Sequence, residues 1–142
     1  MTQKTQSHLF AYGSLQVPDL IRAVIGRIPE SIEAKAEGYR CFTMRGYSFP
    51  GMTPDPTHST PGRILLDLSE AELEKLDEFE GPPYIRERIS LQSGDSQQKS
   101  AWAYIIPGRE TAFITYNPWD LNKFIDKELS TFLRNESDSQ SA

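Results

Sequence analysis

The chain of 142 residues has the length of a single domain, and its 37% hydrophobic and 11% aromatic residues exclude a wholly disordered protein. A net charge of −5 argues against nucleic acid or an anionic membrane as the main partner. A single cysteine argues against a disulfide framework and a multi-thiolate metal site. No apolar run approaches the ~20 residues of a transmembrane helix, so we expect a soluble cytoplasmic protein.

The two ends of the chain are polar. Residues 1–7 and 134–142 carry almost no apolar side chains that could offset the entropy of ordering them, so we expect flexible tails. Between them the sequence contains no repeat and no stretch with the composition of an interdomain linker. Residues 8–133 are therefore predicted to form a single domain.

A strand, a turn and a helix are predicted at the start of this domain. Residues 8–12 form a short apolar and aromatic run typical of a buried strand, which Gly13-Ser14 closes. Pro18 then opens a helix with an apolar stripe, and Gly26 is its natural end.

Extended chain and a loop follow. Residues 31–44 favour a strand, interrupted at Gly38. Residues 45–62 contain four prolines and three glycines, which predict a long irregular excursion over the surface. Residues 63–68 are apolar enough for a central strand.

The next helix has a well-defined start, because Ser69 and Glu72 form a capping box. The helix is predicted to end near residue 81. Its apolar positions recur at helical spacing at Leu73, Leu76 and Phe79.

A hairpin and a final helix complete the elements. Residues 84–91 alternate between polar and apolar side chains and are predicted to pair with residues 101–106. A last amphipathic helix follows Asn117, its candidate cap. Its apolar face would carry Leu121, Phe124, Ile125, Leu129, Phe132 and Leu133. Strands mixed irregularly with helices favour an α+β fold.

Glu80 is the most informative residue for chemistry. It follows Leu73 and Leu76 at helical spacing, so its carboxylate is expected on the apolar face. Desolvation would raise its pKa from about 4.3 toward the ~6–7 of a catalytic acid/base. The alternatives are that Glu80 reaches solvent at the helix end, or pairs with Arg86 or Arg88.

The turn after the first strand is a second candidate. Backbone N–H groups around Gly13 and Ser14 can hold a carboxylate or an oxyanion, although a plain tight turn has the same sequence. Ser14 would need a histidine base to act as a nucleophile, and neither His8 nor His58 is convincingly placed. The scattered histidines and cysteine predict no metal site, and no cofactor motif is present.

Two segments resemble the two signatures of the gamma-glutamylcyclotransferase-like family. They are LFAYGSL at residues 9–15 and LDEFEGPPYIR at residues 76–86, in the family's order and at family-like separation. Gln16 and residues 38–54 make the chain look closest to the branch of avirulence-induced plant proteins and their bacterial relatives. The resemblance covers most of the chain.

The resemblance implies a small mixed β-barrel with flanking helices, whose cavity holds the gamma-glutamyl group of a small-molecule substrate. It implies cyclisation to 5-oxoproline with release of an amine or amino acid, and Glu80 as general acid/base. No cofactor, nucleic acid or membrane is expected to take part. The substrate-binding residues that it implies are Tyr12, Gly13, Ser14, Leu15, Tyr84 and Arg86.

Other interpretations stay open beside this enzyme. One is a non-catalytic small-molecule binding protein with the same cavity, and another is a stress-related interaction protein, which would show an exposed apolar patch. The proline-rich residues 49–61 are hypothesised to cover the cavity and select the leaving group. Amino acids, a lysine ε-amine and polyamines all fit as leaving groups, and no oligomeric state is predicted.

Overall fold

The computed structural model describes residues 7–45, 50–81, 84–94, 97–107, 115, 117, 119–127, 129–131 and 133–134. Its strands are β1 (Ser7–Ala11), β2 (Ser31–Phe42), β3 (Gly51–Leu68), β4 (Ile85–Ser93) and β5 (Gln98–Ile105). Its helices are the short 3₁₀ helix η1 (Ser14–Gln16), α1 (Pro18–Ile25), α2 (Glu70–Glu80) and α3 (Leu121–Lys127).

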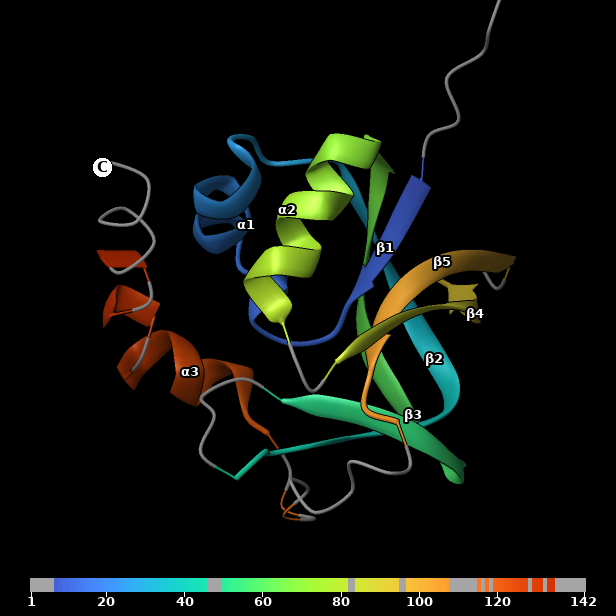
Figure 1. Cartoon of the computed structure of the whole chain (residues 1–142). Coiled ribbons are helices and arrows are strands. Elements are labelled where there is room, and N and C mark those ends of the chain that lie inside the picture. The colour runs from blue at the N-terminus through green and yellow to red at the C-terminus, as the bar shows by residue number, and fades with distance from the viewer. Residues whose placement is uncertain are drawn as a thin grey trace, which may run out of the picture.

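The strands close into one mixed barrel in the order β1-β3-β2-β4-β5. The pairs β1–β3, β3–β2, β2–β4 and β4–β5 are antiparallel, and β5 closes the barrel against β1 in parallel. Helices α1 and α2 lie side by side against the barrel (Figure 1). Helix α3 packs through Phe124 on Leu20 of α1, and Phe79 of α2 packs against the same cluster. The predicted α+β fold, a small mixed β-barrel with flanking helices, is confirmed.

Alternation along β1 separates two apolar clusters. Leu9 and Ala11 pack with α1 and α2 on one face, whereas Phe10 and the following Tyr12 belong to the cluster that fills the barrel. That interior also holds small side chains such as Ala36 and Ala103, both fully buried. A five-stranded barrel is too narrow for an open lumen, so side chains fill its interior.

The predicted loop over residues 45–62 is wrong for residues 51–62, which belong to β3. They pair with β2 from Phe42↔Gly51 onward, although Pro54 and Pro61 lie in the run. Proline has no backbone N–H, so it cannot donate a ladder hydrogen bond and is poorly tolerated in a strand that has partners on both sides. In the described ladder β1 pairs only with the part of β3 from Arg63 onward, so the prolines lie where β3 has β2 as its one partner.

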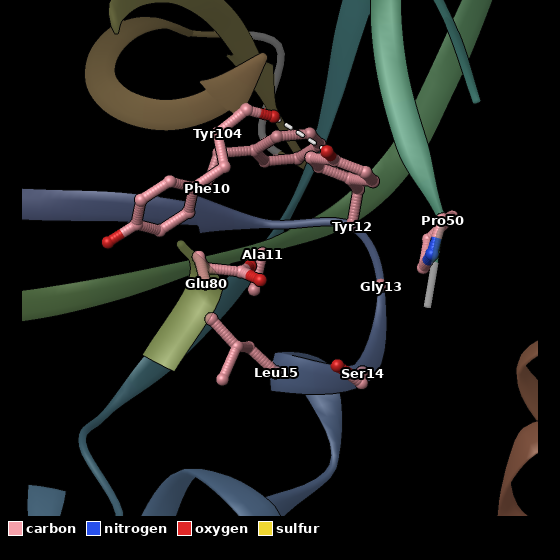
Figure 2. A pocket seen from close by; sticks show the side chains of 9 residues that line it. All are labelled: Phe10, Ala11, Tyr12, Gly13, Ser14, Leu15, Pro50, Glu80 and Tyr104. Atoms are coloured by element: carbon pink, nitrogen blue, oxygen red, sulfur yellow. Dashed lines mark hydrogen bonds between the residues drawn. The ribbon is translucent and has the colours of Figure 1, made fainter. Parts of the chain in front are cut away.

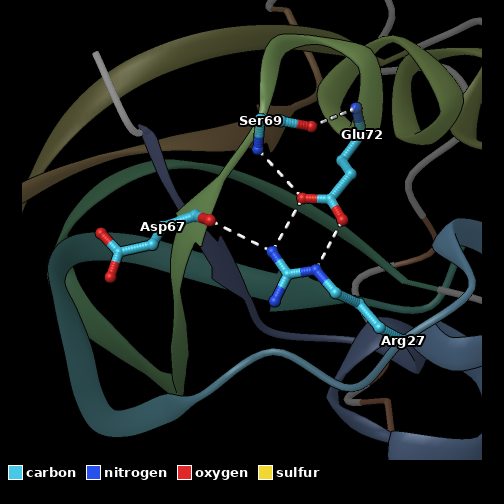
Figure 3. A network of polar contacts seen from close by, with 4 residues as sticks. All are labelled: Arg27, Asp67, Ser69 and Glu72. Carbon is cyan, nitrogen blue, oxygen red and sulfur yellow. Dashed lines mark hydrogen bonds and ion pairs between the residues drawn. The ribbon is translucent and has the colours of Figure 1, made fainter. Parts of the chain in front are cut away.

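The start of α2 is fixed by the predicted capping box, to which Arg27 is added (Figure 3). The Glu72 N–H donates to Ser69 Oγ over 3.1 Å, and the Ser69 N–H donates to Glu72 Oε1 over 3.0 Å. Arg27 donates through Nε and Nη2 to the same carboxylate over 2.6 and 2.8 Å, and through Nη2 to the Asp67 carbonyl. The Arg27 hydrogen bonds lead the causes that lower the pKa of Glu72 to about 2.

The last helix differs in detail from its prediction. The cap is Asp120 rather than Asn117, because Asp120 Oδ1 accepts the N–H groups of Asn122 and Lys123 over 2.9 and 3.2 Å. Phe124 is buried as expected, but Ile125 is 40% exposed, and Phe132 lies outside the described residues. At the chain ends, Ser7 pairs with Leu68 and Arg134 is helical, whereas the rest of the two predicted tails lies outside the described residues.

Replacing Gly62 should destabilise the barrel. A Cβ there would lie 2.4 Å from the Ala11 carbonyl oxygen and 2.8 Å from Phe10 Cζ, so β1 would have to shift. We expect Gly62→Ala to lower the free energy of unfolding by about 1–3 kcal/mol in urea denaturation. Gly94→Ala, whose nearest contact is 3.8 Å away, is the control; equal losses in both variants would contradict the close approach.

The cap of α2 should make stability depend on acidity. A lowered folded-state pKa contributes stability above the unfolded value of about 4.3, and this stability is lost as pH falls toward about 2. We expect Glu72→Gln to cost about 1–2 kcal/mol near neutral pH, measured by denaturation, with the difference closing as pH falls from about 4.3 toward about 2. A constant difference across that range would contradict it; exposed Glu74→Gln is the control.

Candidate functional site

A narrow hollow lies where β1 ends, between the turn that follows it and the last residue of α2 (Figure 2). It contains about 270 Å³ of empty space, mouth included, and we call it the inner hollow. It is lined by Phe10, Ala11, Tyr12, Gly13, Ser14, Leu15, Pro50, Glu80 and Tyr104.

The turn offers backbone donors to this hollow. Among the described residues, the N–H groups of Gly13, Ser14 and Leu15 have no hydrogen-bond acceptor, because the bonds of the turn come from Gln16 and Val17 further on. A Cβ on Gly13 would lie 2.7 Å from the Pro50 ring. Only glycine therefore lets the turn and Pro50 approach so closely, and successive free N–H groups can hold an anionic oxygen.

Glu80 reaches the same hollow from the opposite side. It is the last residue of α2, which ends where the Gly81 N–H bonds the Asp77 carbonyl, and buried Leu73 and Leu76 hold its face against the barrel. Part of the residue stays exposed, but desolvation of the carboxyl raises its pKa to about 8. At pH 7 about a tenth of such a group is ionised, so it can both accept and donate a proton.

A second and larger hollow lies on the other side of Glu80. It contains about 590 Å³ of empty space, mouth included, and we call it the outer hollow. Its lining shares Glu80 and Tyr104 with the inner hollow. The remaining lining residues are Asp77, Gly81, Tyr84 and Arg86.

Asp77 ties this end of α2 to the barrel wall. Its carboxylate accepts Arg86 Nε and Nη2 over 2.7 and 3.1 Å and the Tyr104 hydroxyl over 2.8 Å. The Tyr12 hydroxyl in turn donates to the Tyr104 carbonyl over 2.6 Å, drawn as the dashed line in Figure 2. These bonds connect α2 with β4, with β5 and, through Tyr12, with the end of β1. They hold Glu80 opposite the turn.

Both phenols of this network stay protonated. Burial is the main cause that raises the pKa of Tyr12 well above its ordinary value. Burial also leads the causes that raise the pKa of Tyr104, followed by its hydrogen bond to Asp77. Two neutral donors therefore line the site at physiological pH.

The structure brings most of the predicted site residues together. Tyr12, Gly13, Ser14 and Leu15 line the inner hollow with Glu80, whereas Tyr84 and Arg86 line only the outer one. The Tyr84 hydroxyl donates to the Pro50 carbonyl. Arg86 does not pair with Glu80, as one alternative held, because Asp77 takes it.

One expectation about the cavity is corrected. The inner hollow is lined by Phe10 and Tyr12 of the cluster that fills the barrel and by Glu80 of α2, and the expected cover does not form. Residues 51–61 are not a cover, since they form part of β3; of the described residues in 49–61 only Pro50 lines the inner hollow, and Phe49 lies outside the described residues.

The sequence analysis assigned no role to Asp77 or to Tyr104. Helical spacing could have pointed to Asp77, which is four residues after Leu73 and three before Glu80. Neither histidine is seen to pair with Ser14 in the described part of the chain. His8 accepts the Asp67 N–H, and His58 lies beside Asp55.

The described residues contain no group of three His, Cys, Asp or Glu side chains arranged to hold a metal ion. In the same part of the chain, no helix has the length and apolar character needed to cross a bilayer.

Glu80 should make the fold less stable as pH rises, whereas Glu72 makes it more stable. A raised folded-state pKa contributes stability that is complete below about pH 4.3 and is lost as pH rises toward about 8. We expect Glu80→Gln to be about 2–3 kcal/mol more stable than wild type near pH 8.5 and equal below about pH 4, measured by denaturation. Glu78→Gln, at an exposed position, should follow wild type. A Glu80→Gln curve parallel to wild type would contradict a desolvated carboxyl.

Comparison with known proteins agrees with this geometry. The sequence matches the family described as gamma-glutamyl cyclotransferase, AIG2-like, over residues 9–121. It is 28% identical to AIG2-like protein C of Arabidopsis thaliana over 134 residues, 94% of this chain and 77% of the relative.

Solved structures show the same fold. A solution structure from Arabidopsis thaliana matches with a TM-score of 0.73 at 19% identity, covering 99% of this chain and 85% of that one. A yeast gamma-glutamyl cyclotransferase specific to glutathione matches with a TM-score of 0.67 at 12% identity, covering 92% and 88%. Because the family match spans most of the sequence and the resemblance is thereby confirmed, the chain belongs to the AIG2-like gamma-glutamyl cyclotransferase family.

Proposed function

We propose that the protein cyclises a gamma-glutamyl amide to 5-oxoproline and releases the amine, with Glu80 as the general acid/base. The observation that carries the proposal is a carboxyl with a pKa of about 8 that lines the same hollow as a turn whose N–H groups at Gly13, Ser14 and Leu15 are free among the described residues. Membership of a cyclotransferase family supports the same reaction class.

The inner hollow suits the glutamyl part of such a substrate. A turn with free N–H groups at Gly13, Ser14 and Leu15 can hold an anionic oxygen of that group. The reaction is intramolecular, so the site has to hold one molecule in a bent conformation rather than bring two together. Positioning of this kind is worth up to about 10⁵–10⁸ M in effective molarity.

Glu80 supplies the proton chemistry in two steps. Its ionised form takes a proton from the substrate's α-ammonium, and the neutral amine attacks the γ-carbonyl carbon to form the new C–N bond. The old amide C–N bond then breaks as the protonated Glu80 gives its proton to the departing amine. The new ring nitrogen gives its remaining extra proton to that amine, which leaves as an ammonium, so that Glu80 ends ionised as it began. An α-amino group has a reference pKa of roughly 8, so the first transfer to Glu80, with a pKa of about 8, is nearly balanced in free energy.

The test is a panel of gamma-glutamyl amides with 5-oxoproline measured by chromatography against an enzyme-free blank. We expect turnover of at least one member by wild type and a loss of about 10²–10⁴-fold in kcat in Glu80→Gln. Glu78→Gln on the exposed side of α2 is the matched control and should retain wild-type activity. The kcat/KM profile should rise with pH to a maximum near pH 8 as Glu80 ionises.

Two results would contradict the proposal. Silence of wild type across the panel, with gamma-glutamyl compounds still bound, would favour the non-catalytic binding protein. Full activity of Glu80→Gln would remove Glu80 from the mechanism.

A further inference from the structure

A groove on the wall formed by β2 and β3 takes no part in the proposed reaction. It consists of two adjoining hollows. The basic hollow contains about 640 Å³ of empty space, mouth included, and is lined by Arg40, Cys41, His58, Ser59, Thr60 and Pro61. The aromatic hollow contains about 520 Å³, shares the last two residues and Cys41 with the basic hollow, and adds Trp119 and Tyr12. Neither Glu80 nor residues 13–15 are among the described residues that line the groove.

The basic hollow lies at an interruption of the ladder between β2 and β3. The register shifts between Glu37 and Tyr39, and residues 55–58 of β3 have no partner on β2 in the described ladder. Asp55 holds this segment in shape, because its Oδ1 accepts the Thr57 N–H over 3.0 Å and the Thr57 hydroxyl over 2.7 Å. The wall of the hollow is therefore formed before any ligand binds, which lowers the entropy cost of binding.

Arg40 supplies an available positive charge in the basic hollow. Its Cζ lies 4.7 Å from the centre of the Phe42 ring, and this stacking holds the guanidinium in place. Among the described residues its N–H groups have no hydrogen-bond acceptor, and the nearest carboxylate oxygen, Asp55 Oδ2, is 4.0 Å away. That oxygen also lies 3.2 Å from His58 Nδ1. A placed guanidinium with unused donors is a typical group for binding a carboxylate or a phosphate.

No negative charge on the groove opposes such a ligand. None of the described residues that line the two hollows is Asp or Glu. Burial raises the pKa of Cys41 to about 12, and burial also leads the causes that raise the pKa of Tyr12, so both groups are neutral at physiological pH. Because the whole chain carries a net charge of −5, this local positive charge is not a property of the surface at large.

The aromatic hollow supplies apolar surface beside this charge. Trp119 packs against Phe124 of α3, with the ring centroids 5.8 Å apart, and Leu121 lines the same hollow. Pro61 belongs to both hollows and joins the two surfaces. Sites for small molecules typically combine apolar and aromatic walls with a few polar groups that fix the orientation of the ligand. This groove fits a ligand with a charge at one end and an apolar body at the other.

We propose that the groove binds a small organic anion, with its carboxylate or phosphate on Arg40 and its apolar, preferably aromatic, body in the aromatic hollow. This ligand is distinct from the substrate of Glu80, and the proposal does not rest on the proposed function. Tyr12 lines both the aromatic hollow and the inner hollow, so a ligand in the groove contacts the back of the candidate active site.

Four probes separate the two requirements. Phenylpropionate carries a ring and a carboxylate, phenylpropionamide lacks only the charge, and propionate lacks only the ring. Phenyl phosphate replaces the carboxylate with a phosphate. By calorimetric titration of wild type, we expect at least one of the two aromatic anions to bind about fivefold or more tightly than both the neutral amide and propionate. The tighter of the two aromatic anions then identifies the anionic group.

The matched variants are Arg40→Gln and Arg22→Gln. Arg40→Gln should reduce the preference for the aromatic anion over the neutral amide to less than about a third of the wild-type value, because a charge-assisted contact is lost. Arg22 is an exposed arginine of α1 that pairs with Asp19, and its replacement should leave the preference unchanged. Glu80→Gln should also bind the anion as wild type does, since Glu80 does not line the groove.

Trp119 reports where the anion binds. The chain has two tryptophans, so Trp102→Phe leaves Trp119 as the single one. We expect its fluorescence to change on titration with the aromatic anion and to saturate at the dissociation constant that calorimetry gives.

Several results would overturn the proposal. They are equal affinity for the aromatic anions and the amide, no binding of either aromatic anion, a preference that survives Arg40→Gln, and a Trp119 signal that stays constant at saturation. Loss of anion binding in Glu80→Gln would place the anion in the inner hollow and would overturn the groove as its site. None of these results decides the cyclotransferase function, which the release of 5-oxoproline tests separately.

Discussion

The site depends on the hydrogen bonds of Asp77. This one carboxylate joins Arg86 of β4 and Tyr104 of β5 to the last turn of α2, three residues before Glu80. A helix end is usually the part of a helix that frays, and a carboxylate there would normally turn toward water. Three donors on Asp77 instead hold the end of α2 against the barrel rim, where Glu80 loses solvent.

That loss of solvent connects packing with chemistry. Desolvation moves the pKa of Glu80 to about 8, into the range where one group can accept and return a proton near neutral pH. The same placement divides the space around Glu80 into two hollows of different character, one lined by the turn and one by Arg86, whose guanidinium pairs with Asp77 and stacks on Trp102. A single structural constraint therefore sets both the protonation of Glu80 and the division of the space around it into two hollows.

The local patterns of the sequence were reliable guides to the elements whose ends carry specific side chains. The capping box at Ser69, the proline and glycine that bound α1, and the alternation along β4 all specify their structure within a few residues. The prolines before residue 62 led to the wrong prediction of a loop. Prolines are tolerated in a strand that has a partner on one side only, and the sequence does not reveal where that is the case. Asp120 rather than Asn117 caps α3 for a similar reason, since both residues are good caps.

The sequence by itself determined most of the elements, although not the first part of β3, and it determined that Glu80 falls on the apolar side of its helix and, through two short motifs, the family. These follow from spacing and residue type, which act over a few positions of the chain. Only the tertiary structure decided that the barrel interior is filled, that the inner hollow lies between the turn and Glu80, and that Asp77, Tyr104 and Arg86 meet. Those contacts join residues from α2, β4 and β5, and their geometry depends on how the barrel closes, which no local pattern encodes.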